Sequence, residues 1–369
     1  MKNKQRNASF ELLRMISMCM VIVLHALDKS KILASTEGGV NHIISWILES
    51  LCIQAVNVYV LISGYFLVKS RFKTTRLVEL ICQVLFYSVI GLFVGLSFNL
   101  FEPGYINNYT LFEFFFPIHA NKYWFITKYI IMYLFSPVLA LAVNKMSQKK
   151  LSLIIILLVI YESVVKSISP IIFVPDNLGY DALWFMILFL IAGYIRLYGL
   201  KAVDTKGKAI GLYVIGAALI FAENEVVSVL NQRTGHFAEL KKVAFNYNHI
   251  FALLSSIGLF MIVVNGKKIE GKIADIICAV SPMTLGVYLF HENPAIRFKW
   301  QEIFGLYDAY TKSSLKFILC LLGAVICMFI VGMCFDFVRK CIFDLIKKLT
   351  GRMKITAWLN KLDGIINEE

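Results

Sequence analysis

The sequence has few charged residues for its length. Only 17% of its 369 residues are Asp, Glu, Lys or Arg, whereas about 25% is usual in soluble domains. The hydrophobic share is 59% and the mean hydropathy is +0.71. A soluble protein of this length needs more polar surface than this composition offers. The shortage of charge therefore excludes an ordinary soluble domain and predicts an integral membrane protein whose main solvent is the lipid bilayer.

Several motifs are also missing. The eight cysteines include no CxxC pair and no zinc-like Cys/His spacing, and the histidines are scattered, so no metal is expected. No small-residue cleavage site follows the first apolar segment, which is therefore predicted to remain as a helix. The net charge of +13 comes from short basic segments between apolar ones. That placement is typical of loops facing anionic lipid, and nucleic acid is not expected as a partner.

Ten apolar segments are predicted to cross the bilayer as helices. The ninth contains Pro282 and is expected to be broken or tilted. The ten segments cover residues 12–33, 43–67, 78–100, 122–143, 151–168, 182–199, 210–230, 246–264, 276–291 and 315–338.

Lysine and arginine placement predicts the orientation of these helices. Apart from Arg14 and Lys128, which lie well inside spans, 24 basic residues fall near one set of helix ends, which includes both termini, and 11 near the other. An excess of this kind marks the cytoplasmic side. No loop exceeds about 25 residues, too few for a separate domain. We therefore expect an all-α, polytopic helix bundle with cytoplasmic termini, formed by one transmembrane domain (1–345) and a basic cytoplasmic tail (346–369).

The first predicted helix carries three ionisable residues, Glu11, Arg14 and His25. A charged group at the bilayer centre costs about 2.5–3.5 kcal/mol, so such residues indicate function or pairing. His25 follows Arg14 by eleven positions. On a helix this spacing brings the chain back to within about 20° of the same face, after a rise of about 16 Å. Glu11 is one turn from Arg14 and can pair with it. The alternative is an arginine that extends to the membrane edge and a histidine bonded to a neighbouring helix.

Four motifs in order are similar to those of the membrane-bound acyltransferase family 3. The first is this Arg, ten residues, His pattern. The second is NVYVLISGYFL with Ser63–Gly64, the third is YWFITKYIIMYLFSP, and the fourth is SPMTLGVYLFH with Tyr288 and His291. The second motif departs from the family pattern at Val58 and Tyr59, where many members have Phe. The family core also has ten membrane spans, and the resemblance covers nearly the whole chain.

The resemblance implies transfer of an acyl group, usually acetyl, from cytoplasmic acyl-CoA to a hydroxyl of a glycan or lipid-linked glycan. The protein would be located in a bacterial plasma (inner) membrane. Arg14, with Arg71 and Arg76, would bind the phosphates of CoA by charge-assisted hydrogen bonds. Arg71 and Arg76 match the basic loop of the family only loosely. His25, Arg14 and Glu11 would be the catalytic residues, and His25 would be a base or would itself accept the acyl group.

The other motif residues each have two interpretations. Ser63–Gly64 is a nucleophile and hinge, or a site of close helix packing. The aromatic residues of the fourth span stack on a sugar, or belong to the aromatic belt at the membrane surface. His291 and Glu292 help to orient the acceptor, or are solvated groups at a helix end. The candidate acceptor or cavity residues are Ser63, Gly64, Tyr123, Trp124, Tyr129 and His291.

Two other classes of function compete with the enzyme. A transporter or flippase of a small solute or lipid-linked sugar would use the intramembrane charges as a pathway. Against it, the sequence has no matching pair of Gly/Pro-broken helices in its two halves. A glycan polymerase would need a long external loop with several arginines, and the predicted external loops hold only Arg233 and Arg297. No oligomeric state is predicted.

Overall fold

The structure is a computed structural model that describes residues 6–35, 39–168, 177–350 and 354–367. These residues form helices and helical turns and contain no strand. Nine segments in the described part are long and apolar enough to span a membrane, and Ala182–Tyr198 is a further apolar helix of 17 residues. Each of the ten predicted spans overlaps one of these segments. The prediction of an all-α, polytopic bundle is therefore confirmed.

Local sequence determines where several helices begin and end. The Asp181 side chain accepts a hydrogen bond of 2.8 Å from the Trp184 amide, which caps α9 (Ala182–Tyr198). Asn107 and Thr110 form a reciprocal capping box at the start of α5 (Asn108–Phe115). Gly235 ends α10 (Lys206–Thr234) at φ 73°, a conformation that glycine adopts without strain.

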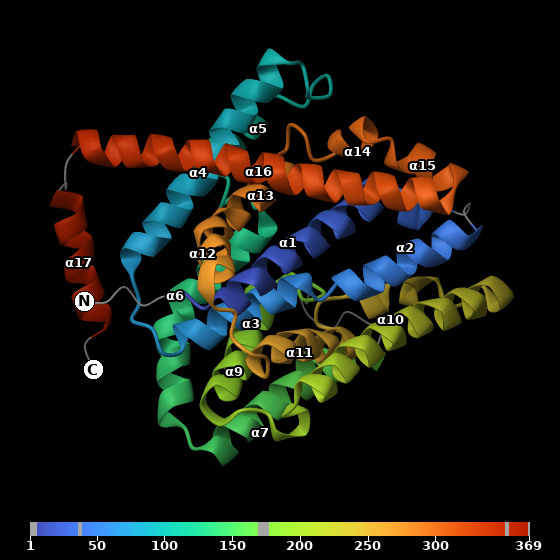
Figure 1. Cartoon of the computed structure of the whole chain (residues 1–369), viewed down its shortest axis with the longest axis horizontal. Coiled ribbons are helices and arrows are strands. Elements are labelled where there is room, and N and C mark those ends of the chain that lie inside the picture. The colour runs from blue at the N-terminus through green and yellow to red at the C-terminus, as the bar shows by residue number, and fades with distance from the viewer. Residues whose placement is uncertain (1–5, 36–38, 169–176, 351–353, 368–369) are drawn as a thin grey trace. The chain divides into compact units, whose positions relative to one another are not determined.

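The described helices divide into two compact units. The first comprises Met1–Leu24, His42–Ser70 and Ile131–Ser281. In it α3 packs against α9 and α11, and α10 lies along α11 (Figure 1). Its helices are α3 (Ala55–Leu67), α7 (Gln148–Val159), α8 (Val165–Ile168), α9, α10, α11 (Ile250–Val264) and α12 (Gly271–Val280), with parts of α1 (Ala8–Lys29), α2 (Gly39–Cys52) and α6 (Trp124–Lys145).

The second unit comprises His25–Asn41, Arg71–Ile130 and Pro282–Glu369. In it α13 and α15 pack on α16, and α4 contacts α5 and α17. Its helices are α4 (Thr74–Ser97), α5, α13 (Thr284–His291), α14 (Trp300–Ile303), α15 (Leu306–Lys312), α16 (Ser314–Thr350) and α17 (Lys354–Ile366), with the remaining parts of α1, α2 and α6.

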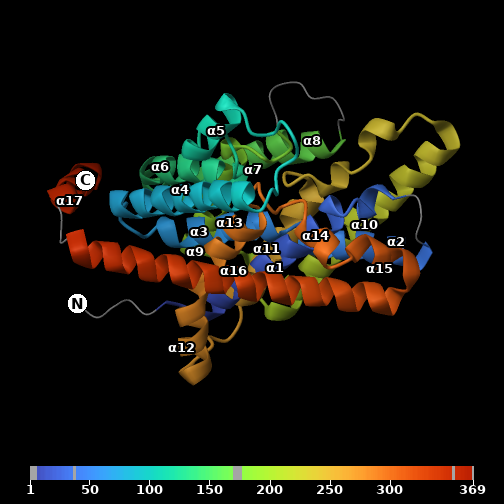
Figure 2. The same cartoon turned by 90° about the horizontal axis from the view of Figure 1, so that it is seen from above.

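The C-terminal part of the chain is helical and contacts the start of α4. The last predicted span, 315–338, is only part of α16, which has 37 residues and is about 55 Å long. The tail predicted from residue 346 therefore begins inside this helix. Asp363 of α17 accepts hydrogen bonds from the backbone amide and the hydroxyl of Thr74, at 2.6 and 2.5 Å. Both views show α17 beside the first turn of α4 (Figure 1, Figure 2).

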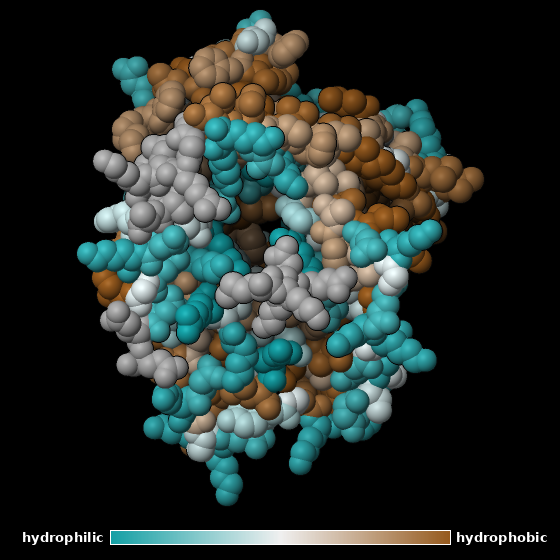
Figure 3. Space-filling view, turned by 60° about the vertical axis from the view of Figure 1, so that its left-hand side comes forward, coloured by the Kyte–Doolittle hydropathy of each residue, from teal (hydrophilic) through white to brown (hydrophobic). Residues whose placement is uncertain are grey.

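Large apolar side chains remain exposed on many helices, as expected where lipid is the solvent. On α16, Leu319 is 59% exposed and Ile326 is 58% exposed. Figure 3 shows broad hydrophobic areas in brown, separated by hydrophilic side chains in teal.

The ninth predicted span is broken, as expected from Pro282. Proline lacks an amide hydrogen and its ring disturbs the preceding helical turn. Accordingly α12 ends at Val280, a short 3₁₀ turn covers Ser281–Met283, and α13 starts at Thr284. The break has a consequence for chemistry, because it makes His291 the last residue of a short separate helix.

Candidate active site

The first helix carries its ionisable residues as predicted. α1 is one continuous helix from Ala8 to Lys29, so the spacing of Arg14 and His25 corresponds to one face and a rise of about 16 Å. Arg14 belongs to the first unit and His25 to the second.

In the first unit, Glu11 and Arg14 form the predicted pair. Arg14 Nη1 donates to Glu11 Oε1 at 2.7 Å, and the Ser281 hydroxyl donates to Glu11 Oε2 at 2.5 Å. The Tyr59 hydroxyl donates to the backbone carbonyl of Arg14 at 2.7 Å. Glu11 is 5% exposed, whereas the Arg14 side chain is 25% exposed. Glu11 therefore fixes the guanidinium at one nitrogen while the rest of the group can reach a ligand.

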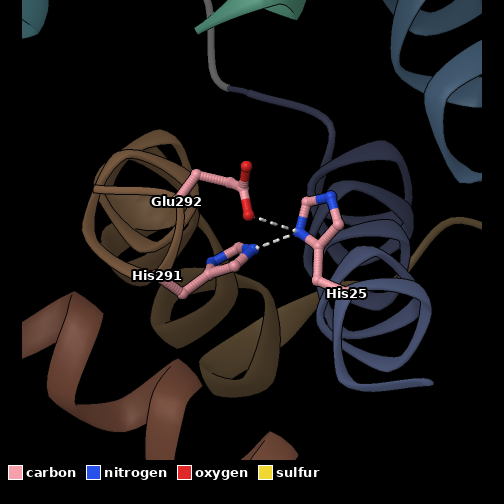
Figure 4. A group of neighbouring side chains, drawn as sticks. All are labelled: His25, His291 and Glu292. Carbon is pink, nitrogen blue, oxygen red and sulfur yellow. Dashed lines mark hydrogen bonds and ion pairs between the residues drawn. The ribbon is translucent and has the colours of Figure 1, made fainter. Parts of the chain in front are cut away.

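In the second unit, α1 and α13 bring together His25, His291 and Glu292 (Figure 4). His25 Nδ1 lies 3.0 Å from His291 Nε2 and 3.2 Å from Glu292 Oε1. The ammonium of Lys29, one turn after His25, pairs with the same carboxylate oxygen. His291 is fully buried, while the His25 side chain keeps 21% exposure. His25 is therefore the member of this cluster that a substrate can reach.

The hydrogen bonds assign the protons of the two imidazoles. His291 Nδ1 lies 2.7 Å from the Val287 carbonyl, which can only accept, so Nδ1 carries the proton. In a neutral ring Nε2 then has a lone pair and accepts from His25 Nδ1. Glu292 offers a second acceptor to the same Nδ1 proton. The Nε2 atom of His25 therefore has the free lone pair, which is the requirement for a base or a nucleophile.

Close packing and buried hydrogen bonds hold α13 in this position. A Cβ atom on Gly286 would clash with the Asp336 side chain of α16, so only glycine allows this approach. After the helix, the Asn293 amide donates to the Tyr87 carbonyl at 2.8 Å and to the Tyr123 hydroxyl at 3.3 Å. The Tyr123 hydroxyl in turn donates to the Leu289 carbonyl at 3.4 Å. These contacts fix the helix end that presents His291 and Glu292.

Comparison with known proteins identifies the family. A family model described as an acyltransferase domain, acyltransferase family 3, matches residues 7–333. The chain belongs to acyltransferase family 3. No curated protein and no solved structure matches it. The family and the spans together make this chain a multi-pass membrane acyltransferase.

The aromatic residues of the fourth span of this acyltransferase have different surroundings. Tyr123 is 1% exposed, and its ring lies 6.2 Å from that of Tyr288, which favours support of α13 over stacking on a sugar. Trp124 and Tyr129 are half-buried, and each contacts the ring of Phe125. These two keep the exposure that a contact with an acceptor requires.

Ser63 and Gly64 lie in the first unit at the contact of α3 with α9. A Cβ atom on Gly64 would meet Phe189 Cα at 2.8 Å and Ala192 Cβ at 3.1 Å. The Ser63 hydroxyl donates to the Tyr59 carbonyl one turn earlier, at 2.9 Å. This geometry favours the packing interpretation of the motif.

Arg71 and Arg76 lie at the start of α4, in the second unit, and both are exposed. The Thr74 amide at this helix start is bonded to Asp363, so a phosphate there would be bound through the arginine side chains.

The sequence analysis of this acyltransferase did not predict three of the site residues. Lys29 counted only as an external loop charge, although its position four residues after His25 places both on one helix face. Asn293 and Gln301 carry no motif. The Gln301 amide donates to the His25 carbonyl at 3.5 Å and to the Arg297 carbonyl at 2.8 Å.

Proposed function

We propose that the protein is an O-acyltransferase of a bacterial inner membrane. It moves an acyl group, acetyl as the first candidate, from cytoplasmic acyl-CoA to a hydroxyl of a cell-surface polysaccharide or lipid-linked glycan. The observation that carries the proposal is the free Nε2 lone pair of His25, which follows from the hydrogen bonds at Nδ1. Family membership supplies the reaction class.

The His25 ring can perform the proton transfers of this reaction. Nε2 takes the proton of the acceptor hydroxyl as its oxygen attacks the thioester carbonyl carbon. The tetrahedral intermediate then loses the CoA sulfur as the C–S bond breaks. The thiolate takes the proton back from Nε2, which leaves an ester, free CoA and the original ring. The Glu292 carboxylate, 3.2 Å from Nδ1, stabilises the imidazolium formed in between.

Binding of the donor is assigned to the basic groups. The glutamate contact uses only Nη1 of Arg14, and the side chain is partly exposed, so other N–H groups can face phosphate oxygens. The exposed Arg71 and Arg76 are expected to add to the attraction of the polyanionic donor.

Transfer of labelled acetyl tests the proposal. Membranes from cells that express the protein are incubated with acetyl-CoA labelled in the acetyl group, and the surface glycans are then isolated and analysed by mass spectrometry. Wild-type protein should add labelled acetyl esters, and His25→Ala should abolish them while still inserting into the membrane. His119→Ala, a change at an exposed histidine, is the matched control and should keep the activity. An active His25→Ala protein would overturn the assignment, and unlabelled glycan with wild-type protein would favour a transporter.

A further inference from the structure

The cluster around His25 also has the donor atoms of a metal site. The sequence predicted no metal because its histidines are far apart, yet the fold brings His25, His291 and Glu292 together. Each offers one ligand atom, and the three atoms lie within 4.8 Å of one another. Two imidazoles and one carboxylate form a ligand set that suits Zn²⁺ and similar ions, and three-ligand zinc sites of this kind take water as the fourth ligand.

The distances are close to those of a bound ion. Zn–N bonds of about 2.0–2.1 Å in a tetrahedral site place neighbouring ligand atoms about 3.3–3.4 Å apart. His25 Nδ1 is 3.0 Å from His291 Nε2 and 3.2 Å from Glu292 Oε1. Two of the three ligand separations therefore need changes of only a few tenths of an ångström.

His291 also has the surroundings that a metal-binding histidine needs. Such residues donate their second ring N–H to a carboxylate or a backbone carbonyl, which fixes the ring and its tautomer. His291 Nδ1 is bonded in this way to the Val287 carbonyl at 2.7 Å. His291 Nε2 is therefore the unprotonated ring nitrogen, which a metal ligand must be.

We propose that His25 Nδ1, His291 Nε2 and the Glu292 carboxylate bind a divalent transition-metal ion such as Zn²⁺, and that this ion inhibits the enzyme. In the metal-free cluster the proton of His25 is on Nδ1. An ion that binds Nδ1 displaces this proton to Nε2, so the ring keeps one proton but loses the lone pair that faces the substrate. The inhibitory half of the proposal rests on the proposed function, whereas the binding half does not.

Lys29 is the internal competitor of such an ion. Its ammonium pairs with the Glu292 oxygen and its side chain is only 10% exposed, so an ion must displace it from the carboxylate. Lys29→Met should therefore tighten the site, because it removes a positive charge without removing a ligand. A merely misfolded variant cannot produce this gain.

Metal binding is measured directly on the full chain in lipid nanodiscs after treatment with a chelator. Zn²⁺ titration calorimetry and the visible absorption of Co²⁺ report affinity and coordination without any substrate. Wild-type protein should bind one ion per chain, and His291→Ala should weaken binding by about 100-fold or more. Glu292→Gln should also weaken it, whereas Lys29→Met should tighten it by about tenfold. His119→Ala, outside the cluster, should not change it. Equal Zn²⁺ affinity in wild type and His291→Ala, or weaker binding by Lys29→Met, would overturn the proposal.

Activity tests the inhibitory half separately. Zn²⁺ should inhibit labelled acetyl transfer at the concentrations at which it binds, and a chelator should restore it. Lys29→Met should lower the Zn²⁺ concentration that is needed for inhibition. Stimulation by Zn²⁺, together with normal binding, would show that the ion does not remove the base. Absence of acetyl transfer under all metal conditions would instead refute the proposed function and leave the binding result intact.

Discussion

Replacing His291 tests whether hydrogen bonding at Nδ1 makes Nε2 the reactive atom of His25. His291→Leu removes the nitrogen that accepts the His25 proton at 3.0 Å. His291→Gln provides an amide oxygen that can accept in its place. His291 is fully buried, so neither change should touch a substrate. Both variants should therefore keep a near wild-type KM and differ in kcat.

The expected loss in kcat has a lower and an upper bound. One net hydrogen bond is worth about 1 kcal/mol, which corresponds to about fivefold in rate. Complete loss of the correct histidine tautomer in the triad of a serine protease lowers kcat by about 10⁴-fold. Glu292 still accepts from Nδ1 at 3.2 Å in the Leu variant. We therefore expect a fall near the lower bound, about 5- to 30-fold for Leu and within about threefold for Gln.

The assay is initial-rate transfer of labelled acetyl by protein in nanodiscs, with donor and acceptor varied separately. A thermal melt of each variant serves as the control for folding, since the Val287 carbonyl loses a hydrogen-bond donor in both variants. Wild-type kcat in His291→Leu would refute the tautomer assignment. A raised KM with unchanged kcat would show that His291 acts in binding instead.

Three further predictions concern packing and donor binding. Gly286→Ala should lower both the melting temperature and the activity, because the added Cβ would clash with Asp336. Gly323→Ala on α16 is the control. A Cβ there has no atom within 4 Å, so this change should be neutral or slightly stabilising. Arg14→Ala should raise KM for acetyl-CoA by about tenfold or more, yet leave the rate with a phosphate-free acetyl thioester unchanged. A double Arg71→Ala, Arg76→Ala variant should raise KM for acetyl-CoA, and the increase should be largest at low salt. The measurement is KM as a function of ionic strength. An increase that does not depend on salt would contradict the role of these arginines in attracting the donor.

Hydropathy was sufficient to predict the membrane-spanning segments because lipid imposes a simple rule on them. A spanning segment must satisfy its backbone internally and present apolar side chains, and both requirements are visible in one sequence. The break before α13 was also predictable, since Pro282 cannot donate a helical hydrogen bond. The length of α16 was not, because a helix continues past the apolar segment into basic sequence without any stop signal.

The site was predicted only where one helix carries it. Glu11 and Arg14 pair within a single turn, so local spacing predicted their contact. His25 and His291 are 266 residues apart, and their contact depends on how α1 and α13 pack. The sequence motifs included both histidines but assigned them separate roles. The packing of Gly286 against Asp336, which helps to place His291, depends on a backbone approach that residue type alone does not specify.

The geometry assigns a role to Glu292 for either chemical route at His25. If the ring acts as a base, it becomes an imidazolium when Nε2 takes the hydroxyl proton. If it accepts the acyl group at Nε2 with the proton still on Nδ1, the acylated ring is also a cation. Both routes therefore place positive charge on the ring, and the Glu292 carboxylate lies 3.2 Å from Nδ1, where it stabilises that charge. Lys29 pairs with the same oxygen and weakens this stabilisation. A neutral residue at position 292 should consequently slow the reaction whichever route it follows, and a neutral residue at position 29 should not.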